Sequence, residues 1–304
     1  MRSLLSFLAI IVTALLVSSS VSAFALSSAS LELSAKRGET IMSSITILNT
    51  QEVDTGYYVG IIGFRPKDET GRPEFLTAET GSNELANWIL FENDSFVVPA
   101  LSASEVPFKV VVPDDIAARS YFAAITVSPA PADVVATNGA IIEAKTASLV
   151  FLTVEGETEE HLEILDFTSV NGSSDLPFRD YQFRLQNQGN VHVTPVGHIL
   201  LTSIFDEMMV IPVNLEEGRV LPDSTRTFEV VHENPLTSWY ATVGYQLSHL
   251  AMGPVTATLD LSYGESGTIQ SSLSFWLFPW QLLVTLLGLL TVLCMLYQFL
   301  RRKH

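Results

Sequence analysis

ITILNTQEVDTGYYVGI, residues 45–61, decides the fold of this 304-residue chain together with a weaker copy, FRLQNQGNVHVTPVGHI, at residues 183–199. Each copy reads as a strand, an Asn-rich corner and a second strand. Apolar and polar residues alternate in both, and β-branched and aromatic residues are frequent, which is typical of half-buried strands. The two copies indicate that one β-structured unit occurs twice.

A second pair of similar segments follows the first pair. FVVPALSASEVPFKVVVPDD (96–115) parallels GRVLPDSTRTFEVVHEN (218–234), because each has a Pro-containing turn, Ser or Thr, and then an alternating strand. The interval from Asn49 to Pro99 is 50 residues, and that from Asn187 to Pro222 is 35. The first copy therefore carries extra residues, mostly in the polar stretch Arg65–Asn87.

The whole body, residues 26–274, consists of short alternating segments separated by Pro, Gly, Asn and Asp. We predict an all-β fold of two tandem β-sandwiches, residues 26–156 and 157–274, which join near Val154–His161. A short helix or turn is expected around Ser82–Trp88, and a single helical turn around Pro235–Tyr240. The clearest predicted strands are Thr40–Leu48, Tyr57–Phe64, Val106–Val112, Tyr121–Val127, Ala147–Val154, Tyr181–Leu185, Arg226–Val231 and Val255–Leu261.

The N-terminal segment, residues 1–25, has the features of a secretory signal peptide. Arg2 precedes an apolar run from Leu4 to Val17, and small residues follow. This order predicts export, with cleavage after Ala23 or Ala25. A retained anchor helix is the alternative, but the run is short for a membrane span.

The C-terminal segment predicts a single transmembrane helix at residues 275–300. Trp276–Leu300 contains no charged residue and exceeds the ~20 residues that span a bilayer. Trp276 and Trp280 are expected at the outer membrane interface. Arg301, Arg302 and Lys303 form a basic tail, residues 301–304, that the positive-inside rule places in the cytoplasm. The body would then be extracytoplasmic on a single-pass membrane protein.

Charge and cysteine content exclude several functions. All 33 acidic residues lie in the body, whereas four of the 16 basic residues lie in the terminal segments. Such a body repels phosphate backbones, so no nucleic-acid partner is expected. The single cysteine, Cys294, lies in the apolar C-terminal run, so the chain forms no internal disulfide and no cysteine-based zinc site.

We find no catalytic constellation, no cofactor motif and no metal-ligand spacing, and therefore predict a non-enzymatic protein with no cofactor. Gly264-Glu265-Ser266-Gly267 lacks the fifth residue of a nucleophile elbow. Glutamates cluster at Glu155–Glu163, near the predicted join, where calcium would stiffen tandem sandwiches. One strand-like run supplies only Glu, so a solvated acidic linker is the preferred interpretation.

Aromatic residues suggest a carbohydrate-binding hypothesis. Tyr57, Tyr58 and Trp88 are candidate ligand-binding residues that would stack on sugar faces if exposed, and Trp239-Tyr240 is a further pair. Tyr57 and Tyr58 alternate on a strand, so at most one of them faces outward. Trp88 fits better as a residue of the first core.

Several segments resemble the WxL-interacting proteins, which are bacterial cell-surface proteins. They are LELSAKRGETIMSSITILNTQ (31–51), NWILFENDSFVVPALSASEVPFKVVVPDD (87–115), SYFAAITVSP (120–129), NQGNVHVTPVGHILLTSIF (187–205), LPDSTRTFEVV (221–231) and FWLFPW (275–280). The resemblance covers nearly the whole chain. It implies two Ig-like domains, of which the first is described in the family as peptidoglycan-binding. It also implies that FWLFPW leads from the second domain into the membrane.

The chain departs from that family pattern at two places. Arg119-Ser120-Tyr121-Phe122 stands where such proteins typically have Gly-His-Tyr-Gly. Tyr240–Gly253 is longer than the usual segment and would form a strand hairpin or a surface flap. We therefore transfer no wall-contact or host-contact residue from the family.

The sequence thus predicts a membrane-anchored cell-surface protein whose Ig-like domains bind cell-wall polymer, partner surface proteins, or both. The alternative is an extracytoplasmic assembly scaffold or chaperone-like protein, because an exposed sheet edge would recruit a partner by strand addition.

Overall fold

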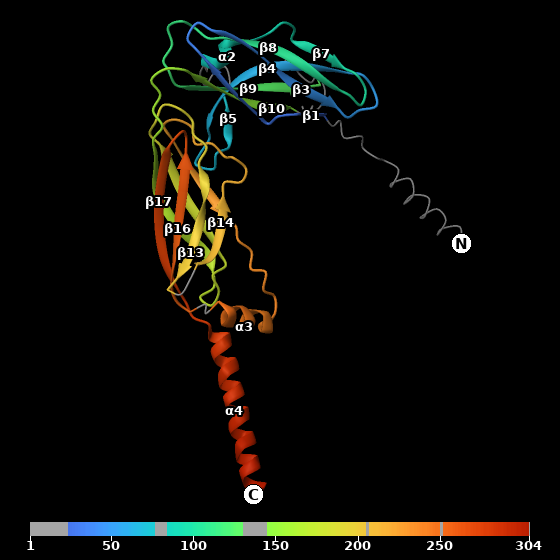
Figure 1. Ribbon diagram of the computed structural model, residues 1–304. Helices are drawn as coiled ribbons and strands as arrows, with labels where there is room; N and C mark the ends of the chain where they lie inside the picture. Colours follow the sequence, from blue (N-terminus) through green and yellow to red (C-terminus); the bar gives the residue numbers. More distant parts are fainter. Residues whose placement is uncertain (1–23, 77–83, 130–144, 205–206, 250–251, 304) are drawn as a thin grey trace, which may run out of the picture. The chain divides into compact units, whose positions relative to one another are not determined.

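The computed structural model describes residues 24–76, 84–129, 145–204, 207–249 and 252–303, so the signal-peptide segment 1–23 lies outside the described residues. The chain divides into two compact units, each built on antiparallel sheets (Figure 1). The first takes in the described residues of 1–63, 77–116 and 121–152. The second takes in those of 64–76, 117–120 and 153–304. The predicted all-β fold of two Ig-like sandwiches followed by a long apolar helix is confirmed.

The strands of the first sandwich form two sheets with the orders β1-β3-β8-β6 and β2-β10-β9-β4-β5, and β7 also pairs with β4. The end of β4 and the whole of β5 group with the second unit. A five-residue helix, α2 (Glu84–Trp88), precedes β6. The strands are β1 (Phe24–Leu26), β2 (Ser30–Ala35), β3 (Thr40–Asn49), β4 (Thr55–Pro66), β5 (Pro73–Phe75), β6 (Ile89–Phe91), β7 (Ser95–Val98), β8 (Ala103–Val111), β9 (Ser120–Ser128) and β10 (Thr146–Val154).

The core of the first sandwich follows directly from the alternation in its sequence. In β8 every second residue is buried, and these residues are Val106, Phe108 and Val110. Strand β9 is buried at most of its positions, as expected of a central strand covered on both sides. Trp88 of α2 is buried against Tyr121, with ring centroids 4.7 Å apart. The short helix therefore closes this core with a large aromatic side chain.

The second sandwich contains a three-stranded sheet, β11-β12-β15, and a four-stranded sheet, β14-β13-β16-β17. Its core includes Phe183, Leu185, Ile199 and Leu259, none of which is exposed. Helix α3 (Trp239–Ser248) lies between β15 and β16 in the chain, and α4 (Trp280–Lys303) follows β17. The strands are β11 (Leu162–Gly172), β12 (Arg179–Asn187), β13 (Val196–Ser203), β14 (Glu207–Val213), β15 (Ser224–Val230), β16 (Gly253–Tyr263) and β17 (Gly267–Leu277).

The two copies of the sequence repeat use their buried asparagine in the same way. Asn49 Nδ2 donates to the carbonyl oxygens of Val53 and Val98, at 2.9 and 3.1 Å, and its Oδ1 accepts from Gln51 N at 3.0 Å. The side chain therefore binds its own corner and the chain opposite at once. Since the bond to Val98 is buried, this asparagine is a structural requirement of the corner.

Asn187 repeats this pattern in the second sandwich. Its Nδ2 donates to the carbonyl oxygens of Val191 and Val220, at 2.8 and 3.0 Å, and its Oδ1 accepts from Gly189 N at 2.9 Å. The turns that follow Val98 and Val220 also correspond, because Leu101 and Asp223 both have a positive φ, 50° and 55°. The repeat read from the sequence is therefore a repeat of structure.

All eight strands named from the sequence are present, and α2 occupies the predicted short helical patch. Two predictions near the C-terminus need correction. The segment Tyr240–Gly253 is neither a strand hairpin nor a flap, because most of it belongs to α3. The apolar helix begins at Trp280 rather than at residue 275, because Phe275–Leu277 complete β17 and Pro279, which has no N–H, precedes the helix.

Candidate functional site at the edge of strand β15

The aromatic residues predicted to bind carbohydrate lie mainly in the first core. Tyr57 is fully buried, its hydroxyl is 3.1 Å from Asn49 Oδ1, and its ring packs against Phe24. Burial also raises the pKa of the Tyr57 hydroxyl. Trp88 is buried in the same sandwich, so neither ring offers a face on which a sugar would stack. Tyr58, one position along β4, is half-buried.

Residues of the acidic segment Glu155–Glu163 accept hydrogen bonds from other parts of the second unit. Glu160 Oε2 accepts from the backbone N of Glu265 at 3.1 Å, and Glu163 Oε2 accepts from Gln188 Nε2 at 2.6 Å. Within the part of the chain that the structure describes, no group of three or more His, Cys, Asp or Glu residues is placed to hold a metal ion.

A groove of about 490 Å³ lies along one flank of the second sandwich, between β14 of one sheet and β15 of the other. Its walls are Ile211–Glu216 and Arg226–His232. Both strands are the last of their sheets, so neither has a neighbour on the groove side within its sheet. An open flank of this kind is where a β-sandwich accepts additional chain.

The two edges of this groove differ in their capacity to bind a further strand. Strand β14 contains Pro212, which has no N–H to donate, and its pairing with β13 is irregular near Thr202. Both features blunt an edge strand. Strand β15 pairs with β12 in continuous register from Ser224 to Val230 and contains no proline. The edge of β15 is therefore the better acceptor.

The outward side of β15 already binds a segment of main chain. The backbone N–H of Thr227 donates to the carbonyl oxygen of Glu69 at 2.6 Å, so it points away from β12. Outward and inward groups alternate along an antiparallel edge strand. The backbone N–H and C=O of Glu229, two residues farther along, therefore point outward as well, on the part of β15 that lines the groove.

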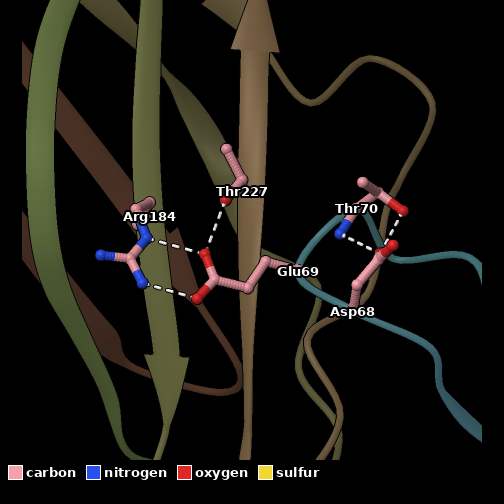
Figure 2. Close-up of polar contacts among 5 residues, drawn as sticks. All are labelled: Asp68, Glu69, Thr70, Arg184 and Thr227. Carbon is pink, nitrogen blue, oxygen red and sulfur yellow. Dashed lines mark hydrogen bonds and ion pairs between the residues drawn. The ribbon is translucent and has the colours of Figure 1, made fainter.

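Figure 2 shows how side chains hold Glu69 at this edge. Arg184 of β12 donates from Nε and Nη2 to the two carboxylate oxygens of Glu69, at 2.8 and 2.6 Å, and Thr227 Oγ1 lies 3.1 Å from Glu69 Oε2. The hydrogen bonds from Arg184 lower the pKa of the Glu69 carboxyl, and Glu69 raises the pKa of Arg184 in return. A two-pronged pair of this type fixes orientation as well as contact.

The loop that carries Glu69 has its own internal supports. Asp68 Oδ1 accepts from the hydroxyl and the backbone N of Thr70, and these bonds lower the pKa of the Asp68 carboxyl (Figure 2). Gly71 has a φ of +77°, and a Cβ at this position would lie 2.4 Å from Cζ of Arg226. A side chain at residue 71 would therefore strain the backbone and would have to displace the Arg226 guanidinium. The loop is built to lie against β15.

Large apolar side chains are exposed beside this edge. Val231 is 70% exposed and Leu215 is 78% exposed, and both line the groove. The buried side chains of Phe228 and Val213 line it as well. Val210 of β14 is 57% exposed nearby in the sequence.

The polar stretch Arg65–Asn87, which carries Glu69, was visible in the sequence as residues that the first copy of the repeat has in excess of the second. The pairing of Glu69 with Arg184 has no sequence signal, because 115 residues separate them.

The predicted membrane-interface residues lie at the C-terminal end of the second unit. Trp276 is exposed on β17, Trp280 is the first residue of α4, Arg301 and Arg302 are exposed near its end, and Lys303 is its last residue. Among the described residues, α4 alone is long and apolar enough to cross a bilayer, by length and composition, with a mean hydropathy of 2.2.

Comparisons with known proteins give similarity of fold only. No protein-family model matches the chain, and no curated protein matches it. The class 5 fimbriae chaperone CfaA shares 12% identity over 84% of this chain and 100% of its own, with a TM-score of 0.40. The E. coli chaperone DraB shares 10% identity over 84% and 98%, with a TM-score of 0.38. A chain from the complex of the Salmonella enterica SafA pilin with the SafB chaperone shares 11% identity over 86% and 99%, with a TM-score of 0.41.

Proposed function

We propose that this protein is a membrane-anchored extracytoplasmic scaffold that binds an extended segment of a partner protein along β15 and in the adjoining groove, without catalysis. The observation that supports this proposal is the backbone hydrogen bond from Thr227 to Glu69, because it uses the outward edge of β15 to hold a second piece of chain. Glu229 offers the next outward backbone groups of the same strand.

The energetics favour an extended apolar partner. Each backbone hydrogen bond at the edge would contribute only about 0.5–1.5 kcal/mol, because water competes for the same groups. Covering an exposed Val or Leu side chain contributes roughly 1.5–3 kcal/mol. Val231 and Leu215 would therefore supply much of the affinity, and the backbone bonds would fix the register. A partner segment with alternating apolar residues fits both requirements.

The location follows from the two ends of the chain. A cleaved signal peptide in the first 25 residues would export the body, and α4 would retain it at the membrane. Arg301, Arg302 and Lys303 would keep the C-terminus in the cytoplasm. The binding edge would then act on proteins that lie outside the membrane.

The resemblance to WxL-interacting proteins makes a bacterial surface protein the expected partner. Cell-wall polymer is the other ligand class that the resemblance implies. The body carries all 33 acidic residues and only 12 of the 16 basic ones, so it would repel anionic wall polymers. We therefore propose a protein partner, and binding to bare wall becomes an outcome of the test.

Site-specific photo-crosslinking in the full-length protein tests this proposal. A photoreactive benzoylphenylalanine replaces Val231 beside β15 in one variant. In the control it replaces Val170 on β11, which is exposed and lies on the opposite edge of the same three-stranded sheet. We expect a defined protein adduct at residue 231 and none at residue 170. Val231→Lys should abolish partner binding, and Val170→Lys should preserve it.

The same preparation, incubated with purified protein-free cell wall, separates the two ligand classes. Equal adducts at residues 231 and 170 would contradict a specific edge. Retention on bare wall that Val231→Lys leaves unchanged, with no protein adduct, would overturn the scaffold proposal in favour of wall binding.

A further inference from the structure

Helix α3 lies directly against the beginning of α4, where the apolar C-terminal helix leaves the second sandwich (Figure 1). Trp239 Nε1 donates to Thr285 Oγ1 of α4 at 3.1 Å. The rings of Trp239 and Trp280 meet edge to face, with centroids 5.3 Å apart. Ser238 caps the N-terminus of α3 by accepting a hydrogen bond from Ala241 N. Helix α3 is thus a defined element that is attached to the first turns of α4.

A buried polar cluster fixes this attachment. Gln246 is fully buried, and its Nε2 donates to Gln281 Oε1 at 2.7 Å and to the backbone O of Asp175 at 3.2 Å. Its Oε1 accepts from the backbone N of Leu282 at 3.0 Å. Gln281 Nε2 in turn donates to the Asp175 carboxylate. A buried amide that satisfies two elements in this way holds them in one arrangement.

The exposed surface of α3 is unusually apolar for a chain with this charge. Tyr240 is 82% exposed and Leu247 is 59% exposed, and Trp239 is also exposed. No Asp, Glu, Lys or Arg occurs from Asn234 to Leu259 or from Ser266 to Leu300, although the chain has a net charge of −17. Exposed aromatic and aliphatic residues without charges are typical of surfaces that contact the headgroup region of a membrane.

The length of α4 places α3 at that region. Its 24 residues extend about 36 Å at 1.5 Å per residue, and the hydrocarbon core of a bilayer is about 30 Å thick. The first turns of α4 would therefore lie at the outer boundary of the core. Because Trp239 donates a hydrogen bond to Thr285 near the start of α4, α3 would lie at the same depth. Interfacial helices bury their apolar face to about 5–10 Å below the headgroups, which matches this depth.

We infer that α3 binds the lipid headgroup layer and, together with the exposed rings of Trp276, Phe278 and Trp280, forms a membrane-contacting platform that holds the second sandwich against the bilayer. This inference rests on the membrane anchorage of α4 in the proposed function. The platform contacts the outer leaflet of the membrane in which α4 is embedded, because it is continuous with that helix.

Fluorescence quenching by brominated lipid tests the platform. The full chain is reconstituted in phosphatidylcholine vesicles that contain a lipid brominated near the headgroup end of its acyl chains. Each variant keeps one tryptophan, with Phe at the other three positions. We expect strong quenching of Trp239 and Trp280 and none of Trp88, which is buried in a protein core.

A second measurement keeps the inference testable if a single-tryptophan variant misfolds. In a Cys294→Ser background, a cysteine introduced at Leu247 should react with a water-soluble maleimide several-fold more slowly than one at Thr268. Thr268 is exposed at the far end of β17. A cysteine introduced at Leu290 of α4 should be protected from the same maleimide if α4 is embedded in the membrane.

The two failures are distinguishable. Quenched Trp280 and a protected residue 290, with unquenched Trp239 and a reactive residue 247, would overturn the platform and leave the anchor intact. An unquenched Trp280 and a reactive residue 290 would overturn the anchorage itself, and the platform with it.

Discussion

Arg184 and Glu69, which are 115 residues apart in the chain, form a two-pronged ion pair at the edge of β15 (Figure 2). Glu69 also provides the carbonyl oxygen that accepts the Thr227 backbone N–H. The pair therefore couples a charged contact to the edge of a sheet. Any condition that neutralises Glu69 should weaken the attachment of the loop that carries it.

Acid should release this loop. The hydrogen bonds from Arg184 lower the pKa of Glu69 below its ordinary value of 4.5. A carboxyl whose pKa is lowered by folding contributes stability that is present above 4.5 and is lost as pH falls through the folded-state pKa. Hydrogen exchange of the Thr227 amide, corrected for its intrinsic rate, should accelerate below that pH. Glu69→Gln should show the fast exchange already at pH 7, whereas Glu74→Gln, at the neighbouring exposed pair with Arg65, should not.

Replacement of either corner asparagine should destabilise one sandwich. Asn49→Ala removes the side-chain donor to the buried carbonyl of Val98, and Asn187→Ala removes the side-chain donor to that of Val220, which Val193 N also binds. Each change should cost about 2–3 kcal/mol, because it removes several hydrogen bonds of one corner at once. In a variant that keeps Trp88 as its single tryptophan, the unfolding transition monitored by Trp88 fluorescence should shift to lower denaturant in Asn49→Ala. An equal response to Asn187→Ala would contradict separate roles for the two corners.

Gln246→Ala should loosen α3. The change leaves Oε1 of the buried Gln281 without its donor, although Gln281 Nε2 keeps its bond to Asp175, and this loss costs about 1–3 kcal/mol. Hydrogen exchange across Trp239–Ser248 should become faster, while exchange in β12 and β13 should stay unchanged. Ser248→Ala is the matched control, because the Ser248 hydroxyl is exposed and bonds only within the end of α3. Equal exchange in the two variants would show that the buried cluster does not hold the helix.

Tyr181→Phe should leave stability unchanged or raise it by up to about 1 kcal/mol. The Tyr181 hydroxyl is buried and has no hydrogen-bond partner in the described structure, and burial raises its pKa to about 12. Because folding raises this pKa, the contribution is complete below pH 10 and is lost as pH rises through about 12. Tyrosinate absorbance should show this late titration in the parent protein but not in Tyr181→Phe. Tyr240→Phe, at an exposed position, should retain it.

The mature chain should begin at Phe24. Both Ala23 and Ala25 fit the cleavage pattern in the sequence, but Phe24 pairs with Asn49 in the ladder between β1 and β3. Its ring also packs on Tyr57, with centroids 5.1 Å apart. Cleavage after Ala25 would remove this ring and two residues of β1. N-terminal sequencing of the exported protein should therefore give Phe-Ala-Leu, and a sequence that begins at Leu26 would contradict the expectation.

Local patterns in the sequence were sufficient where a single element determines its own structure. Alternation in β8 and β16 places every second side chain inside, so those strands were predictable within a few residues. Helix α3 was not predictable in this way. Gln246 and Trp239 stabilise this helix through contacts with α4. The segment itself mixes Tyr, Thr and Gly, which have low helix propensity, so it gives no clear helical signal.

The sequence by itself determined the β-sandwich class, the repeated Asn corner, the acidic body and the apolar C-terminal helix, because each depends on periodicity or composition within a few tens of residues. Tertiary structure alone decided that Tyr57, and not Tyr58, is the fully buried residue of that pair, that Glu69 meets Arg184 at the edge of β15, and that α3 packs on α4. Those outcomes depend on which distant segments become neighbours, and a linear pattern does not encode the geometry of such contacts.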